Sequence, residues 1–176
     1  AYFEYVEESH YPNGIDRLGQ YPNLIVTRPF SKIYGLAGLR VGYGVSSPQI
    51  ADVLNRVRQP FNVDTVALSA ATAVLEDEDY LQRSRDVNTA GLRQLQEAFD
   101  RMGLSYIPSA GNFVAVEVGE PAAGIYQALL AHGVIVRPVA GYGMPRHLRV
   151  SVGLPQENER FLDALAEALA SAGLGA

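Results

Sequence analysis

The chain has 176 residues, of which 48% are hydrophobic and 19% charged, with a formal net charge of -5 at pH 7 and no cysteine. This length accommodates one domain, or one domain plus part of another. The lack of cysteine excludes disulfides, thiol catalysis and thiolate metal sites and fits a cytoplasmic protein, and the acidic balance argues against nucleic-acid binding.

The first part of the chain predicts short strands separated by turns. Residues 1–5 have neither an initiator methionine nor a signal-peptide pattern and read like the end of a buried strand, so we expect the chain to be a fragment. Residues 24–27 are β-branched, which is typical of a strand buried in a mostly parallel sheet, and residues 41–45 predict another strand. A helix is expected over residues 48–58.

The remainder predicts helices and a compact α/β segment. Apolar spacing indicates helix from about residue 64 to 101, with a break around residues 76–79. We expect strands at residues 104–107, 113–118, 134–137 and 148–152, and helices at residues 125–132 and 158–171. This alternation predicts an α/β layer structure. No apolar stretch approaches the length of a membrane span.

Lys32 stands in the least charged part of the chain, between aromatic and aliphatic residues. We expect it to be partly desolvated, which favours the neutral amine, and a nearby Arg40 would add to this by like-charge repulsion. Such an amine can act as a Schiff-base nucleophile. Ser31 and Arg40 offer donors suited to a phosphate. Singly these residues are ordinary, but their order predicts a site for a phosphorylated aldehyde cofactor.

Residues 27–43, which read Thr-Arg-Pro-Phe-Ser-Lys-Ile-Tyr-Gly-Leu-Ala-Gly-Leu-Arg-Val-Gly-Tyr, resemble the lysine signature of fold-type I aminotransferases, which use pyridoxal 5'-phosphate. The match is closest to the histidinol-phosphate aminotransferases, and it continues through residues 58–62, 108–113 and 148–153. The resemblance implies the C-terminal half of such a protein. It divides the chain into the end of the cofactor-binding large domain (1–62), an interdomain helical segment (63–102) and a small C-terminal α/β domain (103–176).

The resemblance also implies the cofactor ligands. Lys32 would form the imine with the cofactor and shuttle a proton, while Ser31 and Arg40 would bind the cofactor phosphate. Tyr2 would hydrogen-bond the phenolic oxygen of the cofactor, although on pattern alone it reads as a half-buried tyrosine at a strand end. The family's aspartate, which pairs with the pyridine nitrogen, is expected just before Ala1.

Two arginines are candidates for binding the substrate. Arg149 matches the family's C-terminal anion-binding arginine, and Arg137 is a second candidate. An arginine in an alternating strand lines a pocket or, more often, points to solvent. Pro29 stands where relatives often have threonine, so one side-chain hydroxyl that could bind the cofactor phosphate is missing. His10 and His132 lack partners at metal-ligand spacing, and no metal site is expected.

The resemblance implies transamination between the pairs glutamate/2-oxoglutarate and histidinol phosphate/imidazole acetol phosphate, a step of histidine biosynthesis. It also implies a cytoplasmic homodimer that binds neither nucleic acid nor membrane. Three alternatives remain open. An aromatic amino-acid aminotransferase would use the same lysine and arginine. A decarboxylase of a phosphorylated amino acid would share the cofactor but release carbon dioxide. The fragment by itself could also be a folded but inactive piece.

Overall fold

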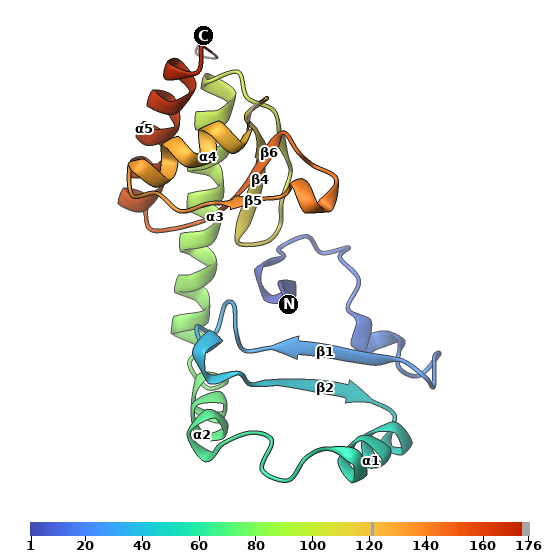
Figure 1. Ribbon diagram of the computed structural model, residues 1–176. Helices are drawn as coiled ribbons and strands as arrows, with labels where there is room; N and C mark the ends of the chain where they lie inside the picture. The colour runs from blue at the N-terminus through green and yellow to red at the C-terminus, as the bar shows by residue number, and fades with distance from the viewer. Residues whose placement is uncertain (121, 174–176) are drawn as a thin grey trace. The chain divides into compact units, whose positions relative to one another are not determined.

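A computed structural model describes residues 1–120 and 122–173. The chain divides into two compact units, Ala1–Arg85 and Asp86–Ala176. Helix α3 (Glu78–Arg101) begins in the first unit and ends in the second (Figure 1). Among the described residues, no helix is both long enough and apolar enough to cross a membrane.

The first unit contains a two-stranded sheet, three 3-10 turns and two helices that precede α3 (Figure 1). Their bounds are η1 (Phe3–Tyr5), η2 (Gly14–Arg17), β1 (Ile25–Pro29), η3 (Ala37–Leu39), β2 (Gly42–Ser46), α1 (Pro48–Val57) and α2 (Thr65–Val74). The helix predicted at residues 48–58 and the break predicted at residues 76–79 are both confirmed.

The expected parallel sheet is wrong for the described residues. Strand β1 pairs antiparallel with β2, with Arg28 opposite Tyr43 and Pro29 opposite Gly42. A parallel pair needs a long crossover, usually a helix, whereas residues 30–41 contain only the short turn η3. The chain therefore turns back directly, and Ile25 remains exposed.

Helix starts in the first unit follow from local side-chain caps. Ser47 Oγ accepts a hydrogen bond from the Ile50 N–H at the start of α1, and Asp64 Oδ1 accepts one from Ala67 N–H at 2.8 Å at the start of α2. These bonds satisfy amides that have no partner inside the helix. Asp77 caps α3 in the same way, by accepting from the Tyr80 N–H at 2.9 Å. The caps explain why one apolar run divides into two helices.

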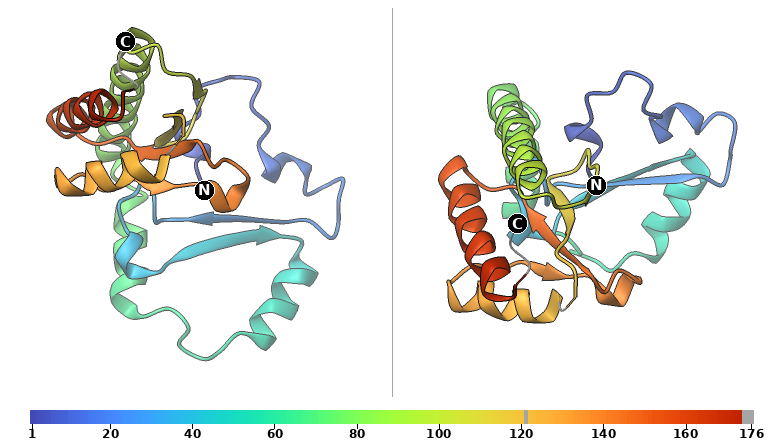
Figure 2. Two further views of the ribbon diagram at one scale, coloured as in Figure 1. Left: turned by 45° about the horizontal axis from the view of Figure 1, so that its top comes forward. Right: turned by 90° about the horizontal axis from the view of Figure 1, so that it is seen from above.

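The second unit is a four-stranded antiparallel sheet in the order β3-β4-β6-β5, with helices packed on it (Figure 2). The bounds are β3 (Tyr106–Ile107), β4 (Phe113–Glu117), α4 (Ala122–Ala131), β5 (Arg137–Pro138), η4 (Ala140–Tyr142), β6 (His147–Ser151) and α5 (Pro155–Ser171). Alternate residues of β4 and β6 face a core that α3, α4 and α5 complete; the central ones are Val114, Val116, Leu148 and Val150.

The two strands predicted at residues 104–107 and 134–137 are shorter than expected. Leu104 and Val134 pack against the core from loops, so their apolar character reflects burial without strand pairing. Gly103 and Gly133 adopt φ values of 67° and 71° just after helices α3 and α4. Such left-handed residues are common helix ends, as predicted for Gly133.

Candidate functional site

Lys32 lies in the turn that follows β1. Its neighbours Phe30 and Ile33 are 4% and 2% exposed and fix the turn to the first unit. Lys32 itself is exposed, so the predicted desolvation is wrong for this chain. The apolar residues Phe30 and Ile33 are buried, whereas Lys32 between them is exposed. Apolar neighbours in the sequence therefore do not bury the lysine.

The Tyr2 ring lies near the Lys32 amine. The Lys32 Nζ lies 5.8 Å from the centroid of the Tyr2 ring, which is within the range of a cation–π contact. Tyr2 immediately precedes η1, and its carbonyl accepts a hydrogen bond from the Tyr5 N–H at 3.0 Å. Two of the four residues predicted to bind the cofactor therefore lie together.

The other two predicted ligands, Ser31 and Arg40, line one cavity of about 540 Å³. Its lining also includes Ala1, Thr27, Arg28, Pro29, Val41, Gly42, Tyr43 and Gly44. A hydroxyl, a guanidinium and glycine backbone are donors that a phosphate monoester accepts. The donor set thus fits the phosphate of the predicted cofactor. Lys32 is not among the described residues that line this cavity, but its neighbour Ser31 is.

Arg40 is held in an unusual backbone conformation. Its φ and ψ are 52° and 42°, in the left-handed region that non-glycine residues rarely adopt. One guanidinium nitrogen donates to the Ala37 carbonyl at 2.7 Å, and the next residue, Val41, is 6% exposed. Left-handed non-glycine residues cost on the order of 1–3 kcal/mol and cluster at functional sites. The strained arginine at the cavity is consistent with an anion-binding role.

Strand register in this region requires a glycine. A Cβ built on Gly42 would lie 2.9 Å from the Arg28 carbonyl oxygen of the paired strand. Any side chain there would push β2 away from β1, and with it the cavity wall that Gly42 and Arg28 share. A glycine is therefore needed at position 42 so that β2 can pair closely with β1, which its place in the glycine-rich motif did not reveal.

Two half-buried tyrosines lie near the lysine turn. Burial is the main cause that raises the pKa of Tyr5, with Tyr80, Tyr2 and Glu4 adding to it. Burial also raises the pKa of Tyr34, with further increases from Glu4 and Tyr43, while Arg85 and Arg28 oppose the shift. The raised pKa keeps both phenols protonated at neutral pH.

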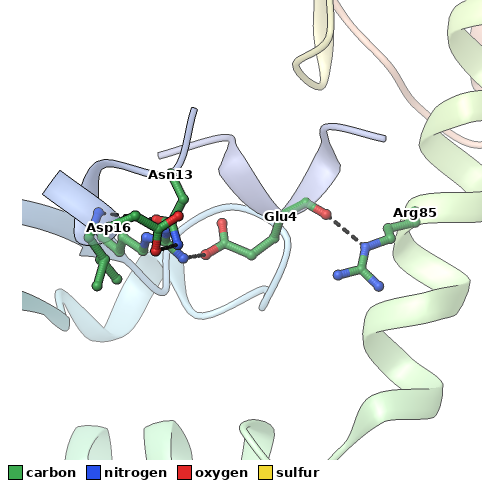
Figure 3. Close-up of polar contacts among 6 residues, drawn as sticks. Glu4, Asn13, Asp16 and Arg85 are labelled. Carbon is green, nitrogen blue, oxygen red and sulfur yellow. Dashed lines mark hydrogen bonds and ion pairs between the residues drawn. The ribbon is translucent and has the colours of Figure 1, made fainter. Parts of the chain in front are cut away.

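A polar network ties the N-terminal segment to β1 and α3. Arg28 Nη1 lies 3.5 Å from Glu4 Oε1, and its Nη2 donates to Asn13 Oδ1 at 2.7 Å. On the other side Arg85 Nε donates to the Glu4 carbonyl oxygen at 2.7 Å. Figure 3 shows Glu4 between Asn13 and Arg85. Sequence reasoning missed this network, because its members are spread from residue 4 to residue 85.

The predicted substrate arginines lie in the second unit. Arg137 on β5 is directly opposite Arg149 on β6. Arg149 Cζ lies 5.0 Å from the Phe113 ring centroid, and its Nε is buried with no hydrogen-bond partner among the described residues. Like charges directly opposite one another are unfavourable in a sheet. An anion between the two guanidinium groups would relieve that repulsion and satisfy the Nε.

Composition carries a signal that the motif search did not use. Lys32 is the single lysine of the chain, and every other basic residue except histidine is arginine. Lysine and arginine are exchangeable on most surfaces, but only lysine condenses with an aldehyde.

Across the part of the chain that the structure describes, no three His, Asp or Glu side chains gather as a metal site.

Comparison with known proteins gives a consistent result. Residues 1–165 match the family described as aminotransferase class I and II. The chain is 63% identical over 172 residues to histidinol-phosphate aminotransferase 2 of Pseudomonas fluorescens and 61% identical over 170 residues to that of Pseudomonas aeruginosa. These matches cover 98% and 97% of this chain but 46% of each relative. The chain therefore spans about half the length of these relatives.

Among solved structures, one of the most similar is the histidinol-phosphate aminotransferase from Sinorhizobium meliloti in complex with pyridoxal-5'-phosphate. The TM-score is 0.86 at 34% identity, covering 96% of this chain and 47% of that one. The agreement in fold extends over both units. The mixed helix and strand architecture is thus that of part of a fold-type I aminotransferase, as predicted.

Proposed function

Because the chain belongs to the aminotransferase class I and II family, we propose that it forms part of a pyridoxal phosphate-dependent transaminase acting on glutamate and histidinol phosphate. The observation that carries the proposal is local. The single lysine of the chain has the Tyr2 ring on one side and, through Ser31, adjoins the cavity that Arg40 lines. This is a site for a phosphorylated aldehyde.

Each cofactor ligand has a role that its chemistry allows. The cofactor, when bound, supplies the electron sink that weakens the bond to the substrate's α-hydrogen. Ser31 Oγ and the Arg40 guanidinium would donate to its phosphate, and the Tyr2 hydroxyl would donate to its phenolic oxygen. Lys32 would hold it through Nζ, and the same nitrogen would then take up the proton from the substrate's α-carbon and deliver it to the cofactor.

The arginine pair would bind the anionic ends of the two substrates. Arg149, with Arg137 opposite it, offers bidentate N–H donors to a carboxylate or to a phosphate. One site of this kind can hold the side-chain carboxylate of glutamate in one half-reaction and the phosphate of histidinol phosphate in the other. This double use supports a ping-pong transaminase. We further propose that the protein works as a homodimer in the cytoplasm.

The proposal is tested on the full-length protein supplied with pyridoxal 5'-phosphate. After borohydride reduction, mass spectrometry should find a phosphopyridoxyl adduct on the peptide that contains Lys32. Lys32→Ala should lose the adduct and lower the transamination rate by roughly four orders of magnitude, because nucleophile and proton carrier go together. Without cofactor, the unfolding free energy of the 176-residue chain should change by less than about 0.5 kcal/mol, since the side chain is exposed there.

Lys32→Arg is the matched control, because it keeps the charge and cannot condense with an aldehyde. It should be as inactive as Lys32→Ala. An adduct on another residue, or a substantial rate in either variant, would overturn the assignment. Parallel rates with histidinol phosphate and phenylalanine separate the proposed substrate from an aromatic amino acid, and carbon dioxide release would reveal a decarboxylase.

A further inference from the structure

We propose that Arg28 is a positioning residue that holds the Tyr2 ring beside Lys32 by clamping the segment that carries Tyr2. The inference rests on the proposed function, in which Tyr2 and Lys32 contact the same cofactor. Arg28 lies on β1 and Lys32 lies four residues later, in the turn that directly follows this strand.

The clamp is built from three contacts of one side chain. Besides the Glu4 and Asn13 contacts, the Arg28 Cζ lies 3.9 Å from the Phe3 ring centroid. The Arg28 and Glu4 side chains are only 12% and 10% exposed. A guanidinium can make all three contacts at once because it is planar and carries five N–H donors, whereas an ammonium cannot. Two of these contacts hold Phe3 and Glu4, the two residues that directly follow Tyr2.

The opposite side of the segment is fixed as well. Arg85 Nε donates to the Glu4 carbonyl, and η1 is closed by the Tyr5 and Val6 N–H groups, which donate to the Tyr2 and Phe3 carbonyls at 3.0 and 3.2 Å. No residue of η1 is buried. Since these residues are only partly buried, the polar contacts of Arg28 and Arg85 contribute to where the segment lies.

The clamp affects Lys32 through the Tyr2 ring, which lies beside its amine. An exposed cation–π contact is worth about 0.5–1 kcal/mol, which corresponds to a two- to fivefold effect on the availability of the amine. Without the clamp, the Tyr2 ring would leave the lysine, and the amine would react faster with an external reagent. This reaction needs no cofactor, so the inference can be measured on the empty protein.

The test compares acetylation of Lys32 by acetic anhydride in the cofactor-free, full-length protein, followed by mass spectrometry of its peptide. Arg28→Gln and Tyr2→Ala should each raise the acetylation rate two- to fivefold. The double variant should match Tyr2→Ala alone, because Arg28 acts through Tyr2. Arg17→Gln is the control, since Arg17 is exposed and contacts Gln20 outside the clamp.

Hydrogen exchange gives an independent measurement of the same clamp. In Arg28→Gln the amides of Tyr5 and Val6 should exchange at least several-fold faster, while those of β4 and β6 keep their rates. Arg28→Lys tests the clamp in a better-preserved fold and should fall between wild type and Arg28→Gln. Unchanged exchange and acetylation in the Arg28 variants, or a double variant that adds the two effects, would overturn the inference. Failure of the proposed function would instead appear as a missing adduct in the wild-type protein.

Discussion

The two units of the chain differ in how they hold their residues in place. The second unit buries a continuous core in which Leu95, Phe99, Leu129, Leu148 and Leu165 are fully buried. The core cluster of the first unit consists of Phe30, Val41, Ala67 and Ala71, while Phe61 is 96% and Val57 73% exposed. The unit with the smaller core carries the predicted cofactor ligands.

This difference shows two ways to fix a side chain. In the second unit, Arg149 stands on a strand whose neighbours Leu148 and Val150 are locked in the core. In the first unit, Tyr2 and Lys32 stand on turns, and polar contacts such as Glu4 with Arg28 replace apolar packing. Stability and chemistry should therefore respond to different substitutions.

Matched phenylalanine substitutions should give the largest separation between the units. Phe99 is 0% exposed and its ring contacts the rings of Tyr106 and Phe161 at 5.9 and 6.3 Å. Phe99→Ala should lower the unfolding free energy by about 3–5 kcal/mol, because it leaves a cavity. Phe61→Ala, the same change in the first unit, should cost less than about 0.5 kcal/mol.

Urea unfolding of the 176-residue chain, for which these exposures hold, measures both changes, and hydrogen exchange of β4 and β6 places the loss in the second unit. The comparison fails if the two variants lose similar stability, or if Phe99→Ala loses less than about 1 kcal/mol.

Sequence alone predicted the elements that depend on local chemistry. The capped helices, the glycine-ended helices and the long strands β4 and β6 follow from residue pattern within a few positions. The predicted parallel pairing of β1 was wrong, since the length and content of the segment between β1 and β2 decide how the two strands pair. The short strands were overestimated because Leu104 and Val134 are apolar for packing and have no strand pairing of their own.

The candidate site was predictable to a similar degree. Motif order pointed to Ser31, Lys32 and Arg40, and the structure has the first and last on one cavity. The exposure of Lys32 was not foreseen, because hydrophobic neighbours along the chain say nothing about which way a side chain points. The Arg28 clamp was also beyond reach, since it joins Glu4, Asn13 and Arg28 across the folded unit.

A glycine in α3 sharpens the comparison with a smaller effect. Gly91 is buried within the helix, where alanine would normally gain about 1 kcal/mol of helix propensity. A Cβ there, however, would collide with Val152 Cγ1 and lie 3.0 Å from Asn158 Nδ2. Overpacking costs about 1–3 kcal/mol, so Gly91→Ala should be destabilising by roughly 1 kcal/mol net.

Thermal and urea unfolding measure the change. Gly19→Ala is the control in the first unit, because no atom lies within 4 Å of the added Cβ and its φ is not left-handed. It should be neutral or slightly stabilising. A stabilised Gly91→Ala would mean that the second unit yields at this contact and is less tightly packed than its buried core indicates.

Arg40 is the position where the first unit should gain stability and lose function together. Arg40→Gly removes a left-handed strain of about 1–3 kcal/mol but adds the chain entropy of glycine, for a net gain of roughly 1 kcal/mol. It also removes the proposed charged donor to the cofactor phosphate, worth about 1.5–3 kcal/mol, so cofactor affinity should fall at least roughly tenfold. Urea unfolding without cofactor and an absorbance titration with it measure the two effects separately. Arg40→Lys keeps the charge and the strain, so it should lose less affinity and gain no stability. Equal affinity in Arg40→Gly and wild type would show that the strain at this residue serves the turn and not the phosphate.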